Sequence, residues 1–223
     1  MMMETLQGMD AALFTMLNSC HNAYFDNFMW LVAGKLAWVI MVLALLWTLR
    51  DKGWRTALLT VLAVALVIAL ADQVSSGMIK PLVQRLRPSH NPDLADTIHV
   101  VNGYYGGRYG FVSSHAANSF GVAVLLAVLF RNRWLTCAMM CWAVLVSYCR
   151  IYLGVHYPGD IVCGALVGVA AGLIVPWLWR KAECRDARWA VVRFGQKDAN
   201  VVTAAVVTNV LILAVVSASG AFA

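Results

Sequence analysis

Long apolar stretches, separated by short polar segments, run along most of the chain. Six of them qualify or nearly qualify for a membrane-spanning helix, which needs roughly 20 mostly apolar residues. They are about Phe28–Leu49, Ala57–Ile79, Ser114–Phe130, Trp134–Cys149, Tyr157–Trp179 and Val201–Ser219. Within residues 4–25, apolar side chains recur about three or four positions apart, which is typical of a helix lying on a membrane surface. These side chains are Leu6, Met9, Leu13, Met16 and Leu17.

This pattern predicts the fold class. We expect an all-α integral membrane protein, a six-transmembrane-helix bundle with an N-terminal interfacial amphipathic helix, built as a single membrane-embedded domain over residues 1–223. Composition agrees, because 61% of the residues are hydrophobic and only 13% are charged, unlike a water-soluble domain. Disorder is excluded as well, since disordered chains are poor in aliphatic and aromatic residues.

The net charge of +6 does not indicate a nucleic-acid partner. There is no run of five basic residues, and the charges lie between the apolar stretches, where topology signals occur. With the N-terminus outside, the cytoplasmic loops hold 11 of the 17 Lys and Arg residues, as the positive-inside rule requires. We therefore expect a multi-pass protein of a bacterial inner (cytoplasmic) membrane, with its N-terminus on the periplasmic side.

Basic residues that remain on the outer side break this rule, which suggests a task for them. They are Lys80, Arg85, Arg87, Arg108 and Arg150. Lys80, Arg87 and Arg150 would repel one another unless an anion lay between them, and their head groups match phosphate oxygens. Ser113 and Ser114 open an apolar helix, whose free backbone N–H groups and positive dipole end form an anion site. These groups predict phosphate binding at the outer face.

Catalytic groups occur in the same outer segments. His156 and Asp160 lie four residues apart, so on one helix face the carboxylate can orient the imidazole, and an oriented neutral imidazole can attack phosphorus. His115, at another helix start, can donate a proton to the leaving oxygen. No acidic cluster suited to Mg²⁺ or Zn²⁺ occurs in the outer segments of the sequence, so we expect metal-independent chemistry and no cofactor.

Three motifs in this order resemble the type 2 phosphatidic acid phosphatase (PAP2) family, which shares its site with vanadium haloperoxidases. They are K-x6-R-P from Lys80, a Ser-x-His stretch ending at His115, and R-x5-H-x3-D from Arg150, all within about residues 75–175. The resemblance implies a phosphohistidine on His156, oriented by Asp160, with His115 as the acid. It further implies a phosphate cradle made of Lys80, Arg87, Arg150, Ser113 and the backbone of Ser114. Three residues depart from the usual motifs, namely Val112 for Pro, Ser114 for Gly and Cys149 for Ser.

The resemblance and the apolar surroundings together imply a lipid phosphatase, of the bacterial membrane branch, acting at the periplasmic face. Its substrate would be a phosphomonoester or pyrophosphate on a lipid headgroup. The sequence does not choose among phosphatidic acid, phosphatidylglycerol phosphate, polyprenyl pyrophosphate and lipid A. Two alternatives stay open: a vanadate-dependent oxidase using the same anion cradle, and a non-enzymatic transporter of anions or lipids.

Other polar residues receive secondary roles. Arg108 lies among glycines that can shape a cap over the site, and it is a candidate substrate contact. Arg85 is interpreted as a solvated or headgroup-facing charge, while His21, His90 and His99 are interpreted as loop or surface residues. Lys35 and Asp72 are charges inside spans, where charges are usually paired. We expect these two to pair across the first two helices.

Overall fold

The computed structural model describes residues 2–34, 36–185 and 194–219, and helices form most of this part of the chain. The bounds are α1 Met2–Asn18, α2 Ala23–Val32, α3 Val39–Leu49, α4 Trp54–Asp72, α5 Lys80–Val83, α6 Ser114–Phe130, α7 Arg133–Tyr152, α8 Pro158–Arg185 and α9 Gln196–Ala218. A π-helical segment, Gln73–Ile79, joins α4 to α5, and three short 3-10 turns occur between α5 and α6. The prediction of an all-α chain is confirmed.

Within the described residues, four continuous helical segments are long and apolar enough to cross a membrane. They are Trp54–Val83, Arg133–Tyr152, Pro158–Ala182 and Gln196–Ala218. The helices α3 and α6 are apolar but shorter. The multi-pass membrane character is therefore confirmed, whereas the count of six spans stays a prediction.

The first expected span, Phe28–Leu49, is not one helix. Helix α2 ends at Val32 and α3 begins at Val39, and side chains bind the backbone carbonyls freed by the break. The indole Nε1 of Trp38 donates to Val32 O at 3.2 Å, and the amide of Asn209 on α9 donates to Ala37 O. Non-helical backbone at membrane depth is tolerated where such groups are satisfied. The expected Lys35–Asp72 pair involves Lys35, which lies outside the described residues.

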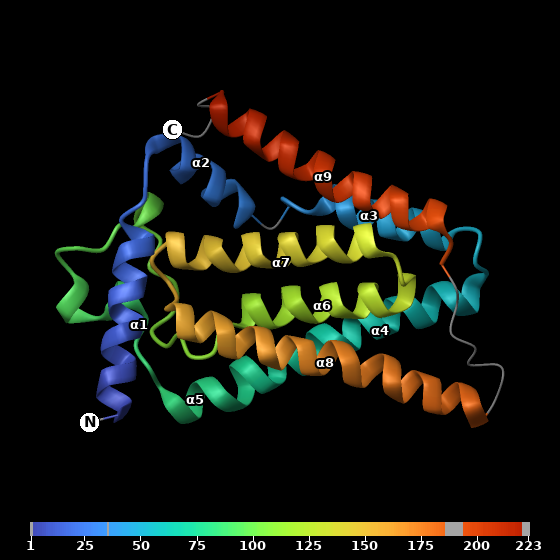
Figure 1. Cartoon of the computed structure of the whole chain (residues 1–223), viewed down its shortest axis with the longest axis horizontal. Helices are drawn as coiled ribbons and strands as arrows, with labels where there is room; N and C mark the ends of the chain where they lie inside the picture. Colours follow the sequence, from blue (N-terminus) through green and yellow to red (C-terminus); the bar gives the residue numbers. More distant parts are fainter. Residues whose placement is uncertain (1, 35, 186–193, 220–223) are drawn as a thin grey trace.

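Helix α6 lies inside the bundle, packed against α4, α7 and α8 (Figure 1). Its contact with α8 is close because small residues face each other. A Cβ atom at Gly164 would collide with the carbonyl of Ser113, and one at Gly168 would collide with the carbonyl of Ala117. Small residues allow membrane helices to approach in this way. The same packing places the first residues of α6 beside the first residues of α8.

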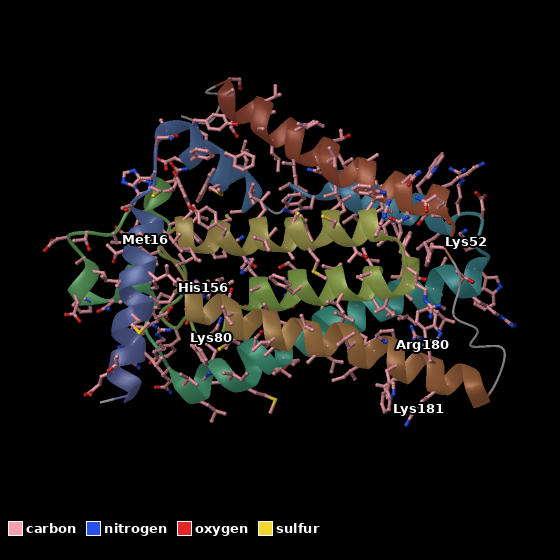
Figure 2. The ribbon with its side chains drawn as sticks, viewed as in Figure 1. Met16, Lys52, Lys80, His156, Arg180 and Lys181 are labelled. Carbon is pink, nitrogen blue, oxygen red and sulfur yellow. The ribbon has the colours of Figure 1, made fainter. Side chains whose placement is uncertain are left out.

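The two ends of the bundle carry different charged groups. Figure 2 shows Lys80 and His156 at one end, and Lys52, Arg180 and Lys181 at the other. Lys80, assigned to the outer side, and Lys52, Arg180 and Lys181, assigned to the cytoplasm, thus lie at opposite ends of the molecule. This arrangement agrees with the sidedness inferred from the sequence.

Helix α1 crosses the end that carries His156, transverse to the bundle helices (Figure 1). Its inner face packs on the protein, with Phe14 buried. Its outer face exposes four apolar side chains, namely Leu6, Met9, Leu13 and Met16. The amphipathic N-terminal helix is present, while its position in a membrane interface stays a prediction.

Candidate active site

The three sequence motifs meet at the end of the bundle crossed by α1. Lys80 begins α5, His115 lies in the first turn of α6, and His156 lies just before α8. The positive charges of Arg150, Arg87 and Lys80 all act electrostatically on His115, as does His156. The structure therefore brings together the catalytic and phosphate-binding residues expected from the sequence.

His156 is buried against Asp160 at the first turn of α8. The imidazole Nδ1 lies 3.3 Å from Asp160 Oδ2, and this oxygen also accepts the backbone N–H of Tyr157 at 3.1 Å. A proton on Nδ1 that is donated to the carboxylate leaves the Nε2 lone pair free for attack. Burial lowers the pKa of His156 to about 4, although the hydrogen bond to Asp160 opposes this shift. The imidazole is therefore neutral at pH 7, as a nucleophile requires.

Arg87 is held by backbone carbonyls from two segments. Its Nε donates to Tyr109 O at 3.1 Å, and its Nη1 donates to Val155 O at 3.3 Å. The chain around it pairs with residues 108–110, because Arg87 N donates to Arg108 O and Gly110 N donates to Arg85 O. These bonds fix the orientation of the guanidinium through Nε and Nη1.

Gly110 permits this close packing. A Cβ at this position would lie 2.9 Å from Asp160 Oδ2, 3.2 Å from Arg87 Cγ and 3.6 Å from His156 Nδ1. Any side chain would therefore displace catalytic groups. The glycine-rich stretch around Arg108 is visible in the sequence, but the role of Gly110 is not, because it depends on the approach of distant segments.

Arg150 and the start of α6 complete an anion site. Arg150 is buried, and within the described residues its Nε has no hydrogen-bond partner. Leaving such a donor unpaired costs about 1–3 kcal/mol, or more for a charged group. Ser113 is the N-cap of α6, its hydroxyl accepting the N–H of Ala116 at 3.4 Å, and Ser114 is the first helical residue. A bound oxyanion would satisfy Arg150 and the positive end of α6 together.

The interpretation of Arg85 as a solvated charge is wrong. Its Nη1 lies 2.7 Å from Asp10 Oδ2 and 3.0 Å from Asp160 Oδ1, and its guanidinium lies 3.9 Å from the centre of the Tyr157 ring. The sequence did not reveal this contact, because Asp10 belongs to a helix expected on the membrane surface. The only sequence feature that could have indicated the contact is the position of an acidic residue, Asp10, on the buried side of that helix.

The remaining candidates lie at the edge of the site. Arg108 is exposed, and its guanidinium lies 5.7 Å from the centre of the Tyr109 ring, so its contact with substrate stays a prediction. His99 is only partly exposed, stacks on His21 and pairs with Asp26 at 2.8 Å. His99 lies in a loop, as expected, and makes a tertiary contact there.

The chain is similar to known proteins in both sequence and fold. Residues 54–184 match the PAP2 superfamily. A lipid A 4'-phosphatase of Bacteroides thetaiotaomicron is 44% identical over 187 residues, covering 82% of this chain and 83% of the relative. A lipid A 4'-phosphatase of Porphyromonas gingivalis is 39% identical over 184 residues, covering 82% and 78%. The fold is similar to a transmembrane PAP2 type phosphatidylglycerolphosphate phosphatase from Bacillus subtilis, with TM-score 0.61, 20% identity, and 79% and 87% of the two chains covered.

Proposed function

The chain belongs to the PAP2 superfamily and is a membrane lipid phosphatase of that type, and we propose that it removes a phosphate from lipid A at the periplasmic face through a phosphohistidine on His156. The observation that carries this proposal is the buried His156–Asp160 pair beside the charges of Lys80 and Arg87. A neutral oriented nucleophile next to an unfilled set of cationic donors suits attack on a phosphate ester.

The proposed reaction has two steps. In the first, His156 Nε2 forms a bond to phosphorus as the bond between phosphorus and the sugar oxygen breaks. His115 donates a proton to that oxygen, which leaves as an alcohol. In the second, His115 removes a proton from water, the water oxygen attacks the phosphohistidine, and inorganic phosphate leaves with His156 restored.

The cationic groups have the role of binding the transferred phosphoryl group. Lys80, Arg87 and Arg150 would neutralise its oxygens, while Ser113 and the Ser114 backbone N–H complete the cradle at the positive end of α6. Because these donors are already in place, little reorganisation is needed as charge develops at the oxygens. Asp160 holds the imidazole and stabilises the positive charge that His156 acquires.

The choice of lipid A rests on the two relatives, both of which carry the name lipid A 4'-phosphatase and match over four-fifths of this chain. The test is phosphate release by the purified protein from a panel of four lipids: lipid A, phosphatidic acid, phosphatidylglycerol phosphate and polyprenyl pyrophosphate. We expect the highest kcat/KM on lipid A, with mass spectrometry showing the loss of one phosphate. Preference for any other member of the panel would refute the substrate assignment while leaving the phosphatase assignment intact.

The panel also tests the expected independence from metals. Activity should persist in excess EDTA, and orthovanadate should inhibit competitively, since it can adopt the five-coordinate geometry of phosphate under attack. Loss of turnover on chelation that Mg²⁺ restores would contradict the proposed chemistry.

The proposed setting is the inner membrane, with a single domain of six spans, the N-terminus and site on the periplasmic side, and α1 in the interface. Two observations support it. The site and the basic cluster represented by Lys52, Arg180 and Lys181 occupy opposite ends of the bundle (Figure 2). The outward face of α1 exposes a row of apolar side chains that lipid would cover.

A further inference from the structure

Helix α1 is bound to the segment that carries the catalytic histidine, although it precedes the residues 54–184 that match the superfamily. Phe14 packs edge-on against the Tyr157 ring, with 5.5 Å between ring centres. Asn18 Nδ2 donates to the carbonyls of Ile151 at 3.3 Å and Tyr152 at 2.9 Å, at the end of α7. Helix α1 therefore contacts the Arg150–Asp160 segment near both of its ends.

Asp10 lies one turn before Phe14 on α1 and has a separate partner for each carboxylate oxygen. Oδ1 accepts the backbone N–H of Gly159 at 2.7 Å, and Oδ2 lies 2.7 Å from Arg85 Nη1. The same Nη1 atom lies 3.0 Å from Asp160 Oδ1. Asp160 uses its other oxygen, Oδ2, for His156. A continuous chain of contacts therefore links α1 to the catalytic imidazole.

The charges of Asp10, Arg85 and Asp160 suggest a role for the second carboxylate, Asp10, in the electrostatics of His156. Arg85 paired with Asp160 alone would offset the negative charge that should stabilise a positive His156. With Asp10 present, two carboxylates share one guanidinium, and the three groups together keep a net negative charge that partly opposes the positive charges of Lys80 and Arg87. The side chains of Asp10 and Arg85 are 15% and 20% exposed, and that of Asp160 is fully buried. Solvent therefore screens these charges less than it would screen a surface pair.

We propose that Asp10 is a positioning residue of the active site, which shares Arg85 with Asp160 and thereby keeps Asp160 aligned on His156 and able to stabilise its positive charge. The proposal rests on the proposed function only in assigning His156 as the nucleophile. It extends the active site to an element outside the superfamily match. Asp10 acts through Arg85 and Asp160 and does not touch the substrate.

The test uses charge changes of opposite sign. Asp10→Asn keeps an oxygen for the Gly159 N–H but removes the negative charge, so the surroundings of His156 become more positive and the pKa of His156 falls. Arg85→Gln removes a positive charge, and the pKa of His156 rises. Other charged or titratable groups that act on this imidazole are unchanged in both variants; they are Asp160, Lys80, Arg87 and His115. A purely structural role for Asp10 would not produce shifts of opposite sign.

Asp26→Asn is the matched control. Asp26 accepts from the Tyr152 hydroxyl at 2.6 Å and pairs with His99 at 2.8 Å, so it ties the same end of the molecule together without contacting Asp160. Asp10→Glu keeps the charge and should retain the wild-type behaviour, even if the amide variant folds poorly. Thermal unfolding in detergent shows whether each variant is folded.

Two readouts decide the proposal. In lipid phosphate hydrolysis, Asp10→Asn should lower kcat roughly tenfold without raising KM. This loss is at the lower end of those caused by removing groups that orient a metal-bound histidine, which we take as the comparison. The acid limb of its kcat/KM profile should move to lower pH, and that of Arg85→Gln to higher pH. In ¹⁵N-histidine NMR, with the His156 resonance assigned from a His156→Gln variant, the titration midpoint should move in the same two directions.

A midpoint and a kcat in Asp10→Asn equal to those of Asp26→Asn would overturn the proposal. An equal loss of kcat in Asp10→Asn and Asp26→Asn with no change in either midpoint would also overturn it, because that result indicates structural support alone. If the wild-type protein releases no phosphate from any lipid, the proposed function fails. The NMR titration then still decides whether Asp10 controls His156.

Discussion

His156 owes its chemical state to burial and to one hydrogen bond. Removal from water favours the neutral imidazole, and Asp160 holds the ring by Nδ1, so Nε2 is left free. Arg87 and Lys80 add positive potential that disfavours protonation further. An exposed histidine would instead be partly protonated near neutral pH and free to rotate.

Replacing His156 tests the nucleophile assignment directly. We expect His156→Ala to lower kcat about 10⁴-fold or more, because no other group can take over bond formation to phosphorus. Asp160→Asn should lose less, since the imidazole remains and only its orientation and charge support are weakened. Phosphate release is the measurement, with thermal unfolding to show that both proteins fold. Substantial turnover by a folded His156→Ala protein would refute the assignment.

The pH dependence follows from the lowered pKa of His156. Attack needs the neutral form, which predominates above a pKa of about 4. The profile of kcat/KM reports ionisations of the free enzyme, so its acid limb should lie near this value. Activity should therefore persist when the pH falls from 7 to 5 and disappear as the pH falls through 4. A limb near the ordinary histidine pKa of about 6.5 would contradict the burial argument.

At the scale of elements, the site depends on how helix ends are brought together. The π-helical segment Gln73–Ile79 lies directly before Lys80, and wide turns of this kind are frequent at functional sites. Helices α6 and α8 approach closely through their glycines, so that Ser113 N donates to Asp160 O at 3.0 Å. This contact places the acid candidate on α6 near the nucleophile before α8.

Gly168→Ala tests this packing. The added methyl group would collide with the carbonyl of Ala117, and overpacking of this kind typically costs about 1–3 kcal/mol. We expect a lower Tm and a lower kcat, because separating α6 from α8 moves His115 away from His156. Gly8→Ala on α1 is the control, since a Cβ there has no neighbour within 4 Å. Equal Tm values for the two variants would show that the helix contact is looser than described.

At the scale of the whole molecule, charge is divided between the two ends of the bundle. The site end holds Lys80 among the basic groups expected to bind phosphate, whereas the opposite end carries Lys52, Arg180 and Lys181 (Figure 2). Positive residues near helix ends are retained in the cytoplasm, so the second group should set the orientation. We expect the first group to remain outside because phosphate binding and carboxylate contacts such as that of Arg85 with Asp160 compensate its charge.

Cysteine labelling tests this orientation without reference to activity. In a background lacking the native cysteines, Asn91→Cys should react with a membrane-impermeant thiol reagent in intact spheroplasts. Gln196→Cys, placed at the start of α9 at the other end of the bundle, should react only after lysis. The reverse pattern would place the site in the cytoplasm and exclude a periplasmic substrate.

The sequence alone determined the helical membrane class and predicted the two charged ends and the catalytic set, because each is encoded locally. The length of an apolar stretch predicts a membrane span, and the four-residue spacing of His156 and Asp160 predicts that they share a helix face. Only the tertiary structure revealed the break between α2 and α3, the need for Gly110, and the Asp10–Arg85–Asp160 chain. Each of these depends on a partner far away in sequence, which becomes a neighbour only when helices pack, and no local pattern encodes that distance.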